Sequence, residues 1–172
     1  MAELWPAGWK CAHDERISPA PLILTAALPP ALQAALDARR DAAALAHAPS
    51  HLTLFRHLPG ARFPALLNDA RRLLRDIGAP TARLLPPLHR ERLWLAPIEA
   101  PALDELRERL AECWQGLLAP GDKAPARLHI SLGRRADPPP ALAEGPWRLP
   151  GLLFWQYGEA CWTPLVALNF RR

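Results

Sequence analysis

Cysteine is scarce in this chain of 172 residues, which limits the kinds of site it can build. The three cysteines, Cys11, Cys113 and Cys161, are odd in number and widely spaced, and no C-x-x-C pattern occurs. These spacings argue against a disulfide framework and against a structural zinc site. Three free thiols suit a reducing compartment, so we expect a cytoplasmic protein.

Lysine is scarcer still, so the positive charge comes almost entirely from arginine. Lys10 and Lys123 are the two lysines, and the formal net charge is +4. This modest excess favours anionic ligands such as phosphate or RNA. Arginine binds phosphate through two parallel hydrogen bonds, which lysine cannot form. The abundance of Ala, Leu, Arg and Pro leaves open the alternative that the arginine content reflects a compositional bias of the genome.

The sequence also lacks an apolar segment suited to crossing a membrane. Residues 17–36 carry no charge, but they include Pro19, Pro21, Pro29 and Pro30. A regular helix does not tolerate prolines at these positions. The preceding residues are charged, unlike a signal peptide. We expect a strand followed by the start of a helix.

Hydrophobic periodicity and turn residues predict an α+β protein. Residues 1–19 are expected to form an N-terminal extension with Trp5 and Trp9 as anchors. Helices are predicted over 31–46, 63–77 and 101–118, and a loop over 121–125; strands are predicted over 21–28, 50–58, 82–85, 92–98, 127–133, 147–157 and 162–170.

One short pattern occurs twice, as His51-Leu52-Thr53-Leu54 and as His129-Ile130-Ser131-Leu132. Side chains alternate between the two faces of a strand, so each copy presents an imidazole and a hydroxyl on the same face. By the same alternation Phe55 should share the face of His51. Only seven residues are Ser or Thr, which makes a chance repeat of this kind improbable.

The copies lie 78 residues apart, close to half the chain. This spacing indicates two similar halves, each supplying one motif strand. We therefore predict a single bilobal domain over residues 20–172. Its two small antiparallel sheets would be flanked by helices in a pseudo-twofold arrangement.

The paired H-x-[T/S] motifs resemble the 2H phosphoesterase superfamily, and within it the 2′-5′ RNA ligase and RNA 2′,3′-cyclic phosphodiesterase proteins. The segments HLTLFRHLPG at 51–60 and GLLFWQYG at 151–158 are also similar to that family. The resemblance implies an active cleft between the two lobes, in which both histidines face one phosphate. It also implies hydrolysis of a 2′,3′-cyclic phosphate at an RNA end or in a cyclic nucleotide.

Two imidazoles that titrate near neutrality can serve as base and acid in one reaction. By the resemblance, His129 is the base and His51 the acid. Thr53 and Ser131 would donate hydrogen bonds to the non-bridging phosphate oxygens. This scheme requires neither a metal nor a cofactor. We expect a monomer with neither DNA nor a membrane as a partner.

Three further residues are candidates near the motifs. Arg134 matches a family position that contacts phosphate, but it can reach the site only if the strand ends or bulges near Gly133. Tyr157 can line the cleft and stack on a base, or it can pack in the core. Arg56 has the same offset from its histidine as Arg134, and we expect it on the surface.

Two alternatives stay open at the level of the sequence. The chain can instead catalyse ligation of 2′-5′ RNA ends, or it can be a non-catalytic RNA-binding module with the same fold. A metal site built on His51 and His57 is disfavoured, because no acidic residue lies near them in the sequence.

Overall fold

A computed structural model of the chain describes residues 4–9, 19–125, 127–134, 139, 141–142 and 145–171. The elements are β1 (Leu22–Ala26), α1 (Pro30–Asp37), α2 (Ala42–His47), β2 (Leu52–Leu58), the 3-10 helix η1 (Gly60–Arg62), α3 (Phe63–Leu74), β3 (Thr81–Leu84), β4 (Leu88–Arg90), β5 (Leu93–Glu99), α4 (Pro101–Cys113), α5 (Pro120–Lys123), β6 (His129–Gly133), β7 (Trp147–Arg148), β8 (Gly151–Gln156) and β9 (Thr163–Asn169).

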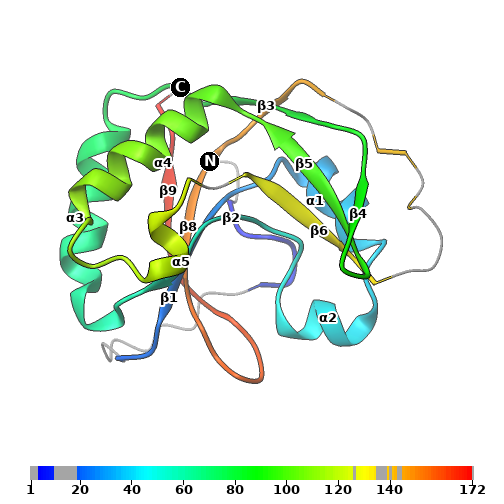
Figure 1. Ribbon diagram of the computed structural model, residues 1–172, viewed down its shortest axis with the longest axis horizontal. Coiled ribbons are helices and arrows are strands. Elements are labelled where there is room, and N and C mark those ends of the chain that lie inside the picture. The colour runs from blue at the N-terminus through cyan, green and yellow to red at the C-terminus, as the bar shows by residue number, and fades with distance from the viewer. Residues whose placement is uncertain are drawn as a thin grey trace.

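The strands form one curled sheet with helices packed against it, which confirms the α+β prediction (Figure 1). The strand order is β7-β3-β5-β6-β2-β1-β8-β9, and β4 pairs with β5. All pairings between these strands are antiparallel. The prediction of two small sheets is wrong in this detail. The two halves are continuous, because β2 and β6 pair at Leu52 and Ile130.

The two halves follow the same course around the centre of the sheet. In the first, β1 leads through α1 and α2 to β2; in the second, β5 leads through α4 and α5 to β6. Proline occupies the first turn of both α1 and α4, where its missing N–H costs no hydrogen bond. Leu52 and Ile130 are equivalent positions of the two motif copies, and they pair with each other. The pseudo-twofold axis therefore passes between the two motif strands.

Three helices, α1, α3 and α4, pack on one face of the sheet and build the main core there. Leu52 and Leu54 of β2 join this core, as does Ile130 of β6. Figure 1 shows α3 and α4 side by side over the sheet. Burying side chains of this size stabilises the fold by about 1.5–3 kcal/mol each.

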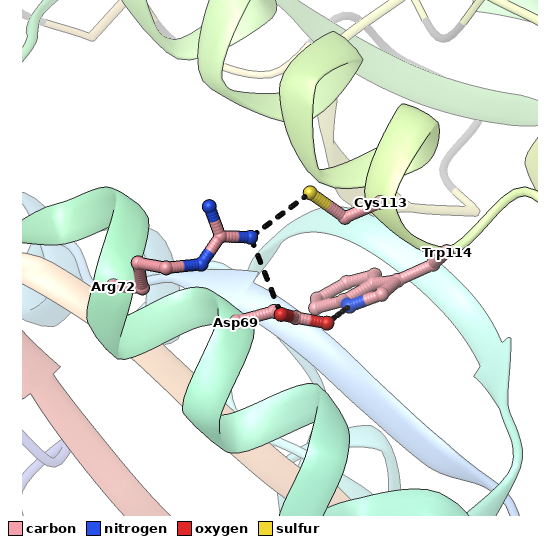
Figure 2. Close-up of polar contacts among 4 residues, drawn as sticks. All are labelled: Asp69, Arg72, Cys113 and Trp114. Atoms are coloured by element: carbon pink, nitrogen blue, oxygen red, sulfur yellow. Dashed lines mark hydrogen bonds and ion pairs between the residues drawn. The ribbon is translucent and has the colours of Figure 1, made fainter.

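A polar contact fixes α3 against α4 (Figure 2). The buried Trp114 donates from Nε1 to Asp69 at 3.2 Å, and Arg72 pairs with the same carboxylate at 3.3 Å. Trp114 also packs its ring 5.2 Å from that of Phe55 in β2. The contact between the helices thus supports the strand that follows the first motif.

The opposite face of β1 and β8 is covered by the N-terminal segment. Trp5 and Trp9 pack edge-on against Trp155, with ring centroids at 4.9 and 5.6 Å. The prediction that these tryptophans act as anchors is confirmed. Because both of its faces are covered, β1 is buried along its whole length. Residues 1–3 and 10–18 of the expected extension lie outside the described residues.

Three local predictions are corrected by the structure. The single helix over 31–46 is two helices, because the Asp41 side chain caps α2 by accepting a hydrogen bond from Ala44 N at 2.7 Å. The helix over 101–118 ends at Cys113, and α5 occupies part of the expected loop. The sequence prediction missed β4, which forms a hairpin with β5 through Glu91 and Arg92, both at positive φ.

Across the described residues, no helix is both long enough and apolar enough to pass through a membrane.

Candidate active site

His51 lies immediately before β2 and is held on two sides. Its Nδ1 lies 2.7 Å from the carbonyl oxygen of Pro49, and its ring packs against Trp162 in a tilted arrangement, with the ring centroids 4.5 Å apart. A carbonyl can only accept a hydrogen bond, so Nδ1 carries the proton and donates it. Nε2 is therefore the nitrogen left for chemistry.

The segment before His51 is fixed by polar contacts from α1. Asp37 accepts a hydrogen bond from Ser50 N at 2.7 Å, and Gln33 donates to Ser50 O at 2.8 Å. Both side chains project from the helix that follows β1. The first histidine is thus positioned by its own half of the molecule.

His129 opens β6 and makes the equivalent contact. Its Nδ1 lies 2.9 Å from the carbonyl oxygen of Arg127, again two residues earlier. The same reasoning assigns the proton to Nδ1 and leaves Nε2 available. The two motif copies therefore fix the same tautomer in the same way.

The side chains of both motifs meet in one cavity of about 900 Å³. His51, Thr53, His129 and Ser131 all line it. The pairing of Leu52 with Ile130 sets the register between β2 and β6. In this register the residues on either side of the pair face each other, so His51 lies across from Ser131 and Thr53 lies across from His129. Residues 78 positions apart in the chain are thereby neighbours.

A β-bulge follows each motif at an equivalent position. Leu54 is the extra residue on β2, between the pairs Thr25–Thr53 and Leu24–Phe55. Leu132 is the extra residue on β6, opposite the step from Trp94 to Leu95. A bulge reverses the alternation of faces beyond it.

The first bulge corrects two predictions made from strict alternation. Phe55 turns into the core, where it is fully buried, instead of sharing the face of His51. Arg56 is exposed, as expected, but it also lines the cavity. Alternation alone would have turned Arg56 away from the motif histidine.

Arg134 follows the second bulge and is exposed. β6 has a bulge at Leu132 and ends at Gly133, which has a φ of 95°. This interruption of the strand is what the sequence pattern requires if Arg134 is to reach the site. Arg134 is nevertheless not among the described residues that line the cavity, whereas Arg127 is. Tyr157 does line it, 43% exposed, with its ring 6.2 Å from that of His47.

The pKa of His51 is lowered from its usual range to about 4. Burial is the main cause, and the charges of Arg40 and Arg56 add to it, while the hydrogen bond to Pro49 opposes it. Burial disfavours the charged imidazolium because it removes water from around the ring. His51 is therefore neutral at pH 7 when the cavity holds no ligand.

The cavity wall carries more positive than negative charge. Arg56, Arg107 and Arg127 line it, and Asp122 is the one carboxylate among the described lining residues. Both oxygens of Asp122 already accept hydrogen bonds from the backbone N–H groups of Arg56 and His57, at 2.9 to 3.1 Å. The wall is thus suited to an anionic ligand.

Arg107 is a buried cation that connects three elements. It projects from α4, donates to Leu54 O in β2 at 3.0 Å, and donates to Asp122 O and Ala124 O around α5. Its guanidinium also lies 4.8 Å from the centre of the Phe55 ring. Burial lowers the pKa of Arg107, and neighbouring carboxylates oppose that shift. An arginine nevertheless stays charged in a protein.

The sequence prediction missed Arg107, Asp122, Arg127 and Trp162. Arg107 had a usable signal, because it falls on the apolar stripe of its helix beside Leu103, Leu106 and Leu110. A charge at such a position needs a partner. Asp122 and Trp162 gave no comparable signal, since both approach the motifs only through the fold.

Metal ligation has no candidate in the described part of the chain, because no group of three His, Cys, Asp or Glu is placed to hold an ion.

Two pseudo-symmetric H-x-[T/S] strands meet at one arginine-lined cavity, which is the arrangement that the resemblance to the 2H phosphoesterases implies. The sequence profile of the 2′-5′ RNA ligase superfamily matches residues 28–155, and the chain belongs to that family. A search among curated proteins found no match.

Solved structures share the fold. The crystal structure of TT0787 of Thermus thermophilus is 27% identical, with a TM-score of 0.63 over 88% of this chain and 98% of that one. E. coli LigT complexed with 3′-AMP is 17% identical, with a TM-score of 0.57 over 90% of this chain and 100% of that one. A structure described as a phosphoesterase is 16% identical, with a TM-score of 0.58 over 90% of this chain and 100% of that one.

Proposed function

We propose that this protein hydrolyses 2′,3′-cyclic phosphates, at RNA ends or in cyclic nucleotides, by metal-independent catalysis with His51 and His129. The observation that carries the proposal is the meeting of both motif pairs in one cavity. Membership of the 2′-5′ RNA ligase superfamily supports it, as does the arginine-rich wall. The complexes of E. coli LigT with 3′-AMP, ATP and NADP⁺ are consistent with a nucleotide ligand in this fold.

The structure favours exchanging the roles that the resemblance implies for the two histidines. A general base must be neutral when the substrate binds, and the lowered pKa keeps His51 neutral. We therefore assign His51 as the base and His129 as the acid.

In the proposed reaction, Nε2 of His51 removes a proton from water while the water oxygen attacks phosphorus. The bond from phosphorus to one ribose oxygen breaks, and His129 gives its proton to that oxygen. The product is a 2′- or 3′-phosphate monoester. Thr53 and Ser131 donate hydrogen bonds to the non-bridging oxygens, which hold the negative charge through the transition state.

The test is turnover of 2′,3′-cyclic nucleotides by the unmodified protein and by His51→Ala and His129→Ala. We expect each substitution to lower kcat by about 10²–10⁴-fold, the usual contribution of a general acid or base. His89→Ala is a matched control, because His89 is an exposed histidine outside the motifs that does not line this cavity. Absence of turnover in the unmodified protein, with RNA binding retained, would favour the non-catalytic binding module.

Ligation of 2′-5′ RNA ends is a second candidate, favoured by the family that the profile names. The same groups serve if the 5′-hydroxyl of a second RNA replaces water as the nucleophile. Incubation of a cyclic phosphate end with a 5′-hydroxyl RNA, followed by analysis of the linkage, separates the two reactions. A product resistant to nucleases specific for 3′-5′ linkages indicates ligation.

A further inference from the structure

A second cavity, of about 1080 Å³, adjoins the catalytic one. It lies beside β4, β5 and α4 and is larger than the catalytic cavity. The two share Arg107, Pro125, Arg127 and His129 in their walls. A ligand whose phosphate lies beside His129 can therefore continue into the second cavity without leaving the surface.

The floor of the second cavity is apolar and belongs to the same face of the sheet as the motifs. Pro97 pairs directly with His129, and Leu95 pairs with both Ser131 and Leu88. Directly opposite residues in antiparallel strands share a face. Leu88 and Leu95 thus extend the motif face beyond β6.

Exposed apolar side chains concentrate around the two cavities. Among the described residues, the large exposed hydrophobic side chains are Leu85, Leu88 and Tyr157. Leu85 and Leu88 line the second cavity, and Tyr157 lines the first. Exposed apolar groups that gather on one concave surface mark a binding site.

The equivalent surface in the other half of the sheet is already covered. There Trp5 and Trp9 pack over Trp155 and bury that side of the motif face. Over β4 and β5, no described segment takes this position, and Leu88 stays 44% exposed. In the described part of the chain, one half of the face is therefore open beside His129.

Charged groups of both signs surround the open half. Arg90 and Arg127 can contact phosphates, whereas Asp104 and Glu108 of α4 repel them. Carboxylates do accept hydrogen bonds from the amino groups of nucleobases. Carboxylates beside an apolar floor fit a base, and the arginines fit the phosphates that flank it.

We propose that the second cavity binds the nucleosides of an RNA end that precede the reacting cyclic phosphate. This inference rests on the proposed function. The acid protonates the ribose oxygen that leaves, so the ribose lies on the side of His129, where the second cavity begins. An RNA end of two or more nucleotides then fills both cavities, whereas a cyclic mononucleotide fills little more than the first.

The experiment compares hydrolysis of a cyclic mononucleotide with that of an adenine dinucleotide ending in a 2′,3′-cyclic phosphate. We expect the dinucleotide to have about a tenfold higher kcat/KM, mainly through KM, as about 1.4 kcal/mol of added binding would give. Leu88→Asp and Arg90→Ala should each remove most of this advantage and leave hydrolysis of the mononucleotide unchanged. Arg83→Ala is the matched control, because Arg83 is an exposed arginine of β3 that lines neither cavity.

The outcomes separate this inference from the proposed function. Equal kcat/KM for the two substrates, or an advantage that survives both substitutions, overturns the second site while leaving the hydrolase intact. Failure to hydrolyse either substrate counts against the proposed function. In that case calorimetry with the dinucleotide still tests the second site, because the site predicts tighter binding to the parent than to Leu88→Asp.

Discussion

His51 is enclosed by Trp162 on one side and tied to Pro49 on the other, while among the described residues its motif equivalent His129 makes the backbone contact alone. Two residues of the same type, in the same local sequence, therefore stand in different surroundings. Burial lowers the pKa of His51, and this is the basis on which the proposed mechanism makes His51 the base.

The titration of His51 is the most direct test of this difference. We predict that its imidazole titrates near pH 4 in the free protein, followed by NMR through the ring proton shifts. Arg56→Gln should raise that pKa, since Arg56 contributes to lowering it. A His51 resonance that titrates near its ordinary 6.5 would contradict the role of base.

The same shift makes stability depend on pH. The pKa of His51 in the folded state is below its value in the unfolded chain, so between pH 6.5 and 4 only the unfolded state binds the proton. The contribution of His51 to the free energy of unfolding is complete above pH 6.5 and is lost as the pH falls toward 4. The loss is about 2–3 kcal/mol for this group. Urea unfolding at pH 7 and pH 4.5 should show a smaller loss in His51→Asn than in the parent. An equal loss in both proteins would show that His51 is not responsible.

At the scale of elements, β2 and β6 pair at Leu52 and Ile130 and then diverge, with α4 and α5 packed between them. On the edge of β2 that no longer faces β6, Leu54 O and the N–H groups of Arg56 and His57 would be left in the cavity wall without a strand partner. Arg107 and Asp122 take these groups as hydrogen-bond partners. The side chains thus replace the missing strand partner, and the strands can diverge to form the cavity.

Asp122→Asn tests this replacement. An amide has one acceptor oxygen, so one of the N–H groups that faces Asp122 would meet an NH₂ group instead of an acceptor. We expect a loss of about 1–3 kcal/mol in the free energy of unfolding, measured in urea, together with a lower kcat. Asp76→Asn is the matched control, because Asp76 is exposed and lies far along the chain from the site. Unchanged stability and turnover in Asp122→Asn would show that β2 does not depend on this carboxylate.

At the scale of the whole molecule, the two halves share one core. The main cluster joins Leu24 and Leu54 of the first half to Leu103 and Ile130 of the second. The tryptophans report on different parts, since Trp155 lies under the N-terminal segment and Trp114 lies between α3 and α4.

We therefore predict that the two halves unfold together in one transition. Fluorescence of Trp155→Phe and Trp114→Phe variants, each compared with its own far-ultraviolet circular dichroism, should give coincident midpoints. Trp5→Ala should lower the stability of the whole molecule by about 1–3 kcal/mol, because it uncovers Trp155. Separate transitions for the two optical signals would indicate that the lobes unfold independently.

Most elements were predictable because their patterns are local. The strand predicted at 50–58 and the helix predicted at 63–77 show clear periodicities, and they correspond to β2 (Leu52–Leu58) and α3, which ends at Leu74, a few residues before Gly78 and Pro80. The division at Asp41 and the β4 hairpin were missed. The reason is that a cap in the middle of an alanine-rich run and a turn without glycine give weak local signals.

The sequence by itself determined the paired motifs, their hydroxyl partners and the similarity of the two halves. Those features depend on residue identity, on the alternation of a strand and on the 78-residue spacing of the two copies, all of which can be read along the chain. The tertiary structure decided that the halves share one sheet, that bulges turn Phe55 inward and Arg56 toward the cavity, and that Arg107 and Asp122 hold β2 beside it. It also set the pKa of His51, because burial by Trp162 and the charge of Arg40 come from residues that only the fold brings near. Desolvation and Coulomb forces act through space, so no spacing along the chain reveals them.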